Sequence, residues 1–165
     1  MILAGILLKL GGYGLVRLGK DFSFDCFFTR YLFSIGLVGG LLTCFLCLRQ
    51  VDFKSLVAYS SVCHIGLVFL GLIFFNVVCV GGSYLIMIFH GLVSSCLFIL
   101  LFFLYIRYNS RRIVFNKSVL SSIPLLGGWC FLFVILNISV PPSLGFFSEI
   151  LVLGSFFIFY LSLGF

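Results

Sequence analysis

The chain has 165 residues, of which 63% are hydrophobic and 8% are charged, and its mean hydropathy is +1.36. A soluble domain needs more charge on its surface, and this length holds about five or six membrane-spanning helices with no room for a soluble catalytic domain. The net charge of +6 does not indicate nucleic-acid binding, because most of the ten lysines and arginines lie at the ends of apolar stretches. The composition predicts an all-α, polytopic transmembrane helix bundle, with residues 1–165 forming a single transmembrane region.

The apolar stretches follow one another with short polar connections. We expect spans at about 1–17, 31–48, 53–75, 83–105 and 118–139, and then a further apolar segment that continues to Phe165. Residues 76–82 are typical of a short turn, and residues 107–117 form a basic connection. Because the first stretch starts abruptly and no stop signal closes the last one, we expect the chain to be a part of a longer protein at both ends.

Basic residues are distributed unequally between alternate connections. The connections after the second and fourth stretches contain six of them: Arg49, Lys54, Arg107, Arg111, Arg112 and Lys117. The opposite side has three, Arg17, Lys20 and Arg30, which Asp21 and Asp25 partly offset. The excess of Lys and Arg predicts that the two richer connections lie together on the matrix or cytoplasmic side.

Pro141 and Pro142 interrupt apolar sequence about twenty residues after the fifth stretch begins, with Asn137 and Ser139 just before them. Proline lacks a backbone N–H donor and clashes with the preceding turn, so a continuous helix is not expected here. Non-helical backbone at membrane depth survives only inside protein or beside a water-filled cavity, and discontinuous helices recur at the ion sites of transporters. We therefore predict a discontinuous helix; a plain loop between two whole spans is the alternative.

Four ionisable residues lie in four separate apolar stretches: Lys9, His64, His90 and Glu149. Such groups are costly in a bilayer unless they face a polar interior, and they often mark routes for protons or ions. Each could also have a purely structural role. Lys9 could extend to the membrane surface, either histidine could be a satisfied core residue, and Glu149 could stabilise the start of the helix after the prolines, with Ser148 as a cap.

Hydroxyl groups accompany both histidines. Ser60, Ser61 and Lys54 share one helical flank with His64, and Ser94 shares a narrower stripe with His90. Imidazole both donates and accepts hydrogen bonds, which suits it to relay protons between hydroxyl groups and waters. Two histidines in adjacent spans with the same kind of neighbour favour a relay over two unrelated core residues.

The remaining patterns indicate no cofactor or metal site in this chain. Cys44 and Cys47 have CxxC spacing, but there is no second pair and no nearby histidine, so we interpret the seven cysteines as small polarisable side chains between helices. No Gly-rich phosphate loop and no nucleophile–base motif is present. Phe and Gly abound, whereas alanine occurs twice and glutamine once. The abundant residues have codons rich in T and G, and this composition predicts that the chain is encoded in a mitochondrial genome.

Four segments carry a family resemblance: LAGILLKLGGYG at residues 3–14, CLRQVDFKSLVAYSSVCH at 47–64, HGLVSS at 90–95 and PPSLGFFSE at 141–149. In this order they resemble the subunit 4 family of mitochondrial NADH:ubiquinone oxidoreductase (complex I). Subunit 4 is one of the antiporter-like, proton-translocating subunits of that complex. The resemblance covers nearly the whole chain, and it implies that the spans of this chain correspond to the eighth to twelfth of the fourteen spans of that subunit. It implies that Lys9 is the connecting lysine, His64 and His90 are central relay histidines, and Glu149 is the acidic residue of the broken twelfth helix.

The chain also departs from the family pattern. The family's first glutamate–lysine unit would precede Met1, so this chain alone is not expected to pump protons. Ile106 stands where the family usually has a glutamate, and Asn109 where it often has a histidine. Matrix-side proton entry through that carboxylate is therefore in question here.

The resemblance implies a membrane-arm subunit that couples quinone reduction to proton pumping in the mitochondrial inner membrane, and an enzyme only as part of NADH:ubiquinone reductase. It implies NAD, FMN, iron–sulfur clusters and ubiquinone in partner subunits, with other membrane-arm subunits and the lipid bilayer as neighbours and no nucleic acid. Two other functions stay open: an autonomous secondary cation/proton antiporter, and a structural scaffold whose polar residues serve helix packing.

Overall fold

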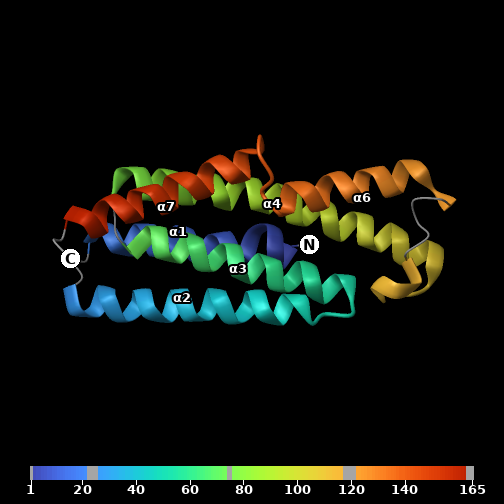
Figure 1. The fold of residues 1–165 in the computed structure, drawn as a ribbon, viewed down its shortest axis with the longest axis horizontal. Coiled ribbons are helices and arrows are strands. Elements are labelled where there is room, and N and C mark those ends of the chain that lie inside the picture. The colour runs from blue at the N-terminus through green and yellow to red at the C-terminus, as the bar shows by residue number, and fades with distance from the viewer. Residues whose placement is uncertain (1, 22–25, 74–75, 117–121, 163–165) are drawn as a thin grey trace.

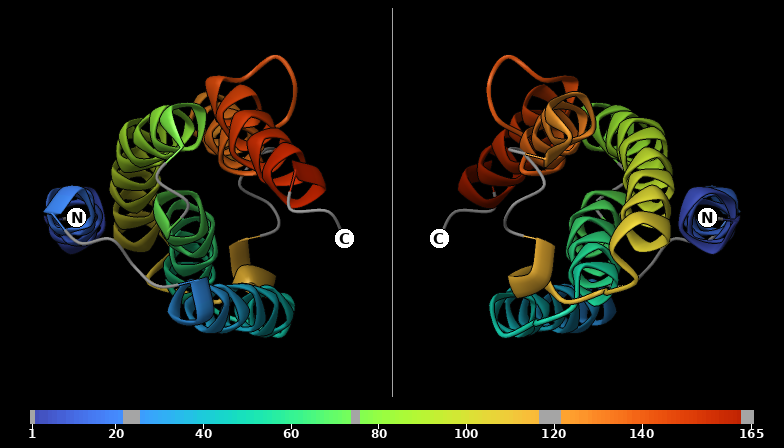
Figure 2. Two further views of the ribbon diagram at one scale, coloured as in Figure 1. Left: turned by 90° about the vertical axis from the view of Figure 1, so that its left-hand side faces the viewer. Right: turned by 90° about the vertical axis from the view of Figure 1, so that its right-hand side faces the viewer.

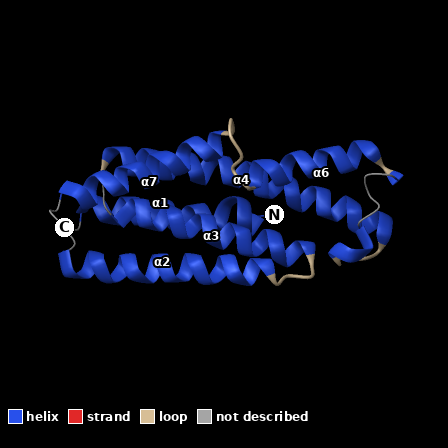
Figure 3. Ribbon diagram, viewed as in Figure 1, coloured by secondary structure: helices blue, strands red, loops and turns tan. Residues whose placement is uncertain are grey.

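The fold is that of a computed structural model, which describes residues 2–21, 26–73, 76–116 and 122–162. The described residues form helices and connections (Figure 3). One isolated β-bridge joins two of the connections. The predicted all-α helix bundle is confirmed. In chain order the helices are the π-helix η1 (Leu3–Leu7), α1 (Leu8–Asp21), α2 (Cys26–Leu48), α3 (Phe53–Ile73), α4 (Val77–Tyr108), the 3₁₀-helix η2 (Ile113–Asn116), α6 (Pro124–Asn137) and α7 (Leu144–Ser162).

The helices run up and down along one long axis (Figure 1). Among the described residues, three segments are long and apolar enough to cross a membrane: Arg30–Leu48, Phe53–Ile73 and Val77–Tyr108. Helix α3 lies between α2 and α4, and α1 lies on the side of α4 away from α6 and α7 (Figure 2). Helix α1 continues to Asp21, beyond the predicted end near residue 17, because polar residues at a membrane surface do not by themselves stop a helix.

Helices α6 and α7 form one discontinuous crossing. They follow one another in the same direction, antiparallel to α4, and both pack on α4 (Figure 1). Their 14 and 19 residues correspond to about 50 Å of helix, against about 48 Å for the 32 residues of α4. The predicted break at Pro141 and Pro142 is confirmed, and the apolar segments on either side are halves of one crossing. The helix before the break runs from Pro124 to Asn137, two residues short of the end of the expected span at 118–139, and residues 118–121 of that span lie outside the described residues.

Helix α4 begins at Val77, earlier than expected, and includes a glycine pair that the sequence favoured as a turn. Gly82 is buried where α7 crosses α4. A Cβ atom at Gly82 would lie 2.8 Å from Val152 Cγ2 and 3.2 Å from the carbonyl oxygen of Ser148. The glycine thus permits close approach of the two helices, which is the small-residue packing found in membrane bundles.

We expect Gly82→Ala to lower the free energy of unfolding by about 1–3 kcal/mol, because the added methyl group overlaps α7. Gly81→Ala is the matched control, since a Cβ atom at Gly81 meets nothing within 4 Å. Denaturant titration of the two purified variants in micelles measures the difference. Equal stability of the two variants would show that close packing at Gly82 does not stabilise the contact between α4 and α7.

The two basic connections lie together at one end of the bundle. The backbone N–H of Ile113 donates to the carbonyl of Val51 at 3.0 Å, and the N–H of Phe53 donates to the carbonyl of Arg111 at 3.2 Å. An antiparallel bridge joins Asp52 to Arg112 between these bonds. The structure therefore confirms that the two connections share a side, although the predicted contribution of Lys117 lies outside the described residues.

Candidate functional site

The four predicted ionisable residues come from four different helices and gather in the middle of the bundle. Lys9 lies on α1, His64 on α3, His90 on α4 and Glu149 on α7. Lys9, His64 and His90 line one cavity, and His64, His90 and Glu149 line a second, smaller one. Residues as far apart in the sequence as Lys9 and Glu149 thus border neighbouring cavities.

The closest contact in this group joins His64 to Glu149. Nδ1 of His64 lies 3.3 Å from Oε1 of Glu149, and Nε2 lies 3.1 Å from the backbone carbonyl oxygen of Asn137. A carbonyl oxygen only accepts hydrogen bonds, so Nε2 carries a proton and the imidazole is oriented by this bond. Nδ1 and Oε1 are then the two atoms that can exchange a second proton. Both the imidazolium–carboxylate pair and the neutral imidazole–carboxylic acid pair satisfy this geometry.

The helix break supplies two polar residues that sequence reasoning did not include in the site. Ser139 Oγ donates to Oε1 of Glu149 at 2.7 Å, and Asn137 Nδ2 donates to Ser60 Oγ at 3.1 Å. Ser139 has a positive φ of 59°, an uncommon value for a residue other than glycine, in the turn that follows α6. The available signal was the position of Asn137 and Ser139, polar residues in an apolar stretch just before the two prolines.

His90 lies deeper than His64, with an exposed fraction of 5%. Its ring centroid is 4.8 Å from that of His64, and neither ring nitrogen has a hydrogen-bond partner among the described residues. A cavity of about 10 Å³ borders His90, Asn137 and Glu149, which is room for about one water molecule. A buried polar group normally has a partner, so the two nitrogens are positioned to bind water.

Lys9 reaches the site across a glycine of α4. A Cβ atom at Gly91 would lie 3.3 Å from Cε and 3.9 Å from Nζ of Lys9, so the lysine side chain passes directly over this position. The cavity that Lys9 shares with His64 and His90 has a volume of about 540 Å³. Glycines of α1, α2 and α3 form much of its wall, and these three residues are its ionisable groups.

The four polar residues predicted to support the two histidines do not all lie in the site. Ser60 joins the site through Asn137. Ser61 and Ser94 are buried, but their hydroxyl groups donate to carbonyls of their own helices, at Ala58 and Gly91. Lys54 is not in the site, because it lies at the basic end in the first turn of α3.

Glu149 does not start the helix after the break. Helix α7 begins at Leu144, so Glu149 lies in its second turn, where the effect of the helix dipole is small. The capping side chain is Ser143, whose Oγ accepts from the N–H of Phe146 at 3.3 Å. Ser148 instead donates to the carbonyl of Gly145 within the helix. The alternative in which Ser148 caps this helix does not hold, because the helix begins at Leu144, two residues after Pro142, and Ser148 lies inside it.

The CxxC cysteines make separate contacts. Cys44 Sγ lies 2.8 Å from Cys63 Sγ on α3, and Cys47 Sγ donates to the carbonyl of Leu56 at 3.6 Å. All three thiols are free. These contacts fill the space between α2 and α3, which agrees with a packing role.

The sequence that forms this site matches a known protein family. Residues 1–164 match the family model described as NADH:quinone oxidoreductase/Mrp antiporter, transmembrane region. The chain belongs to this family. As a member of the NADH:quinone oxidoreductase/Mrp antiporter family with apolar helices of spanning length, it is a multi-pass membrane protein.

Curated members of the family are similar over almost the whole chain. NADH-ubiquinone oxidoreductase chain 4 of Ceratitis capitata is 46% identical over 156 residues, which is 94% of this chain and 35% of that protein. The proteins of the same name from Mytilus edulis and Myxine glutinosa are 46% and 40% identical, over 93% and 96% of this chain. The chain thus spans about a third of the length of the relatives it matches.

Proposed function

We propose that this chain is a part of a proton-translocating membrane subunit of a respiratory NADH:quinone oxidoreductase, and that Lys9, His64, His90 and Glu149 carry protons through the middle of the membrane. The contact of His64 with Glu149 beside the helix break carries this proposal. A partly buried acid and a partly buried base that can share a proton next to non-helical backbone are suited to transport. Packing alone does not require them.

The proton steps follow from the orientation of the side chains. A proton on Nδ1 of His64 passes to Oε1 of Glu149, while Ser139 stabilises the carboxylate oxygen in its charged form. His64 retains its Nε2 proton on the Asn137 carbonyl, so the ring does not need to turn for this transfer. The step moves charge between α3 and α7 across a contact of 3.3 Å.

His90 and Lys9 extend the route toward α1. A water molecule in the small cavity would accept a proton from His90 and donate it to the Glu149 carboxylate, while Asn137 could accept a hydrogen bond from the water. On the other side, the larger cavity places the Lys9 ammonium near His90, across Gly91. Proton arrival at Lys9 or departure from it changes the charge beside His90, which couples the two ends of the route through Coulomb interaction at low dielectric.

The setting that we propose follows from the name of the relatives, NADH-ubiquinone oxidoreductase chain 4. The subunit would lie in the mitochondrial inner membrane among other membrane-arm subunits, with the basic end toward the matrix. Quinone reduction would supply the free energy, and NAD, FMN, iron–sulfur clusters and ubiquinone would be bound by partner subunits. The enzyme activity would belong to the assembled complex, with this chain taking part through proton transfer.

We expect Lys9→Met in the assembled complex to lower proton pumping per NADH oxidised by about tenfold or more, since a positioned acid–base side chain contributes roughly 10²–10⁴-fold and water replaces it only in part. Proton uptake and NADH oxidation in sealed vesicles give this ratio. Arg17→Met is the control, because it removes the same charge from the exposed part of the same helix. A complex that assembles poorly but pumps with an unchanged ratio would instead favour the scaffold function.

The family description also includes antiporters, so an autonomous cation/proton antiporter is the second candidate. Cation-dependent proton movement by the full-length protein reconstituted without partners would favour that function. Strict co-purification with a redox complex, together with no transport by the isolated protein, would favour the respiratory subunit.

A further inference from the structure

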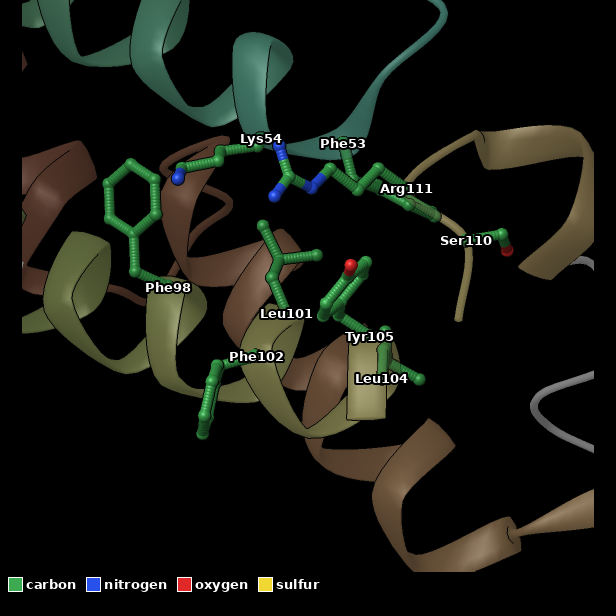
Figure 4. A pocket seen from close by; sticks show the side chains of 9 residues that line it. All are labelled: Phe53, Lys54, Phe98, Leu101, Phe102, Leu104, Tyr105, Ser110 and Arg111. Carbon is green, nitrogen blue, oxygen red and sulfur yellow. The ribbon is translucent and has the colours of Figure 1, made fainter. Parts of the chain in front are cut away.

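A pocket at the basic end of the bundle lies away from the proton route. It has a volume of about 110 Å³ and opens between the start of α3 and the end of α4. Lys54 and Arg111 form one side of it, and Phe98, Leu101, Phe102 and Tyr105 line the other (Figure 4). The pocket thus combines two cations with an apolar wall.

The two cations are held close together by the fold. The backbone bonds between the two connections bring Arg111 beside Phe53 and hence beside Lys54. Figure 4 shows the nitrogen ends of both side chains extending over the same side of the pocket. Arg111 Cζ lies 5.1 Å from the centre of the Tyr105 ring, a cation–π contact that fixes the position of the guanidinium.

Acidic groups do not balance these charges within the pocket. Among the described residues that line it, none is acidic. Asp52 lies next to it in the chain, but its backbone pairs with Arg112 and it is not one of the lining residues. Two neighbouring cations repel each other. An anion placed between them is attracted to both, which makes the Coulomb energy of the group favourable. The first α3 turn adds the positive end of a helix dipole.

The apolar wall continues from the cations toward the middle of α4. Tyr105, Phe102 and Phe98 follow one another along the helix, and Phe102 has an exposed fraction of 59%. Basic residues at this depth meet the headgroup layer of a membrane, and apolar residues farther along the same helix meet the acyl chains. A ligand with both an anionic group and a long apolar part matches this order.

We propose that this pocket binds an anionic phospholipid, with its phosphate between Lys54 and Arg111 and an acyl chain along Phe98 and Phe102. The apolar wall favours a lipid over free inorganic phosphate, which would use the cations alone. The bound lipid would join α3 to α4 at the end where their connections already pair.

The test uses the complete complex that contains this chain, reconstituted with phosphatidylglycerol or phosphatidylcholine carrying a photoreactive group on an acyl chain. Mass spectrometry of the digested chain measures labelling of residues 98–105. Because each basic residue near the surface changes the affinity for anionic lipid by about fivefold, Lys54→Gln/Arg111→Gln should weaken phosphatidylglycerol binding by about 30-fold. Arg49→Gln/Arg107→Gln is the matched control, since both residues are exposed at the same end and neither lines the pocket.

We expect phosphatidylglycerol to label residues 98–105 of the native and control complexes well above phosphatidylcholine, and this preference to disappear in the Lys54/Arg111 variant. Equal labelling by the two lipids in the native complex would overturn the proposal, as would unchanged preference in the variant. Absence of labelling by either lipid would also overturn it, in favour of a pocket covered by protein. Complete displacement by millimolar inorganic phosphate would assign the site to a free anion.

Discussion

Glu149→Gln in the assembled complex is expected to abolish most proton pumping, with a loss of about a hundredfold in the rate of proton transfer. The amide has the size of the carboxylic acid and can still accept from Ser139, so the local packing is retained. It cannot take a proton from Nδ1 of His64, which lies 3.3 Å from the carboxylate in the native chain. The transfer between α3 and α7 is therefore lost with little change in shape.

Proton uptake measured against NADH oxidation in sealed vesicles is the direct readout. Ser148→Ala is the matched control, because Ser148 is the buried neighbour of Glu149 and its hydroxyl group donates only within α7. The control variant should pump like the native complex. Native pumping by Glu149→Gln would mean that the carboxylate has no part in the route and that the residue serves only as a hydrogen-bond acceptor.

The second large effect is on stability. His64→Leu should lower the free energy of unfolding by about 2–3 kcal/mol, because Glu149 loses its imidazole partner in a partly buried place. Removing one partner of a fully buried pair would lower the free energy of unfolding further, but the exposed fractions of the two side chains are 16% and 24%. Asn137 also loses the donor to its carbonyl oxygen. The loss should appear as a lower midpoint in denaturant titration of the purified full-length protein.

A double variant separates the charge effect from simple loss of packing. Adding Glu149→Gln to His64→Leu replaces the unpaired carboxylate with a neutral amide, so the double variant should be more stable than the sum of the single changes predicts by about 1 kcal/mol or more. If the two free-energy changes simply added, the two side chains would not be energetically coupled, and the short distance between them would have no consequence for stability.

The sequence predicted the helices well where composition decides the outcome. Helix α2 ends at Leu48 and α3 begins at Phe53, as expected, since charged residues lie between the two apolar runs. Helix α2 begins at Cys26, five residues before the expected start, and includes Arg30 in its second turn. It failed at the glycine pair of α4, because the same residue type that permits a turn also permits close helix packing. Only the position of α7 against Gly82 distinguishes the two.

The site was predictable by residue type and less so by geometry. Ionisable groups in apolar sequence identified Lys9, His64, His90 and Glu149, because such side chains are costly in a bilayer and are found mainly where they face a polar interior. The sequence could not reveal that Ser139 and Asn137 serve the same site, since their side chains reach it only through the turn that the broken helix makes. Their hydrogen bonds to Glu149 and Ser60 link positions on different helices.

The backbone pairing at the basic end also bears on the order of biosynthesis. The segment at Val51–Phe53 leaves the ribosome about sixty residues before its partner at Arg111–Ile113. At roughly 5–20 residues per second, the hairpin of α2 and α3 waits on the order of 3–12 s, with its connection unpaired, until α4 has been made and inserted. This end of the bundle consequently closes only after α4 has been made, and insertion factors have that interval in which to act on it.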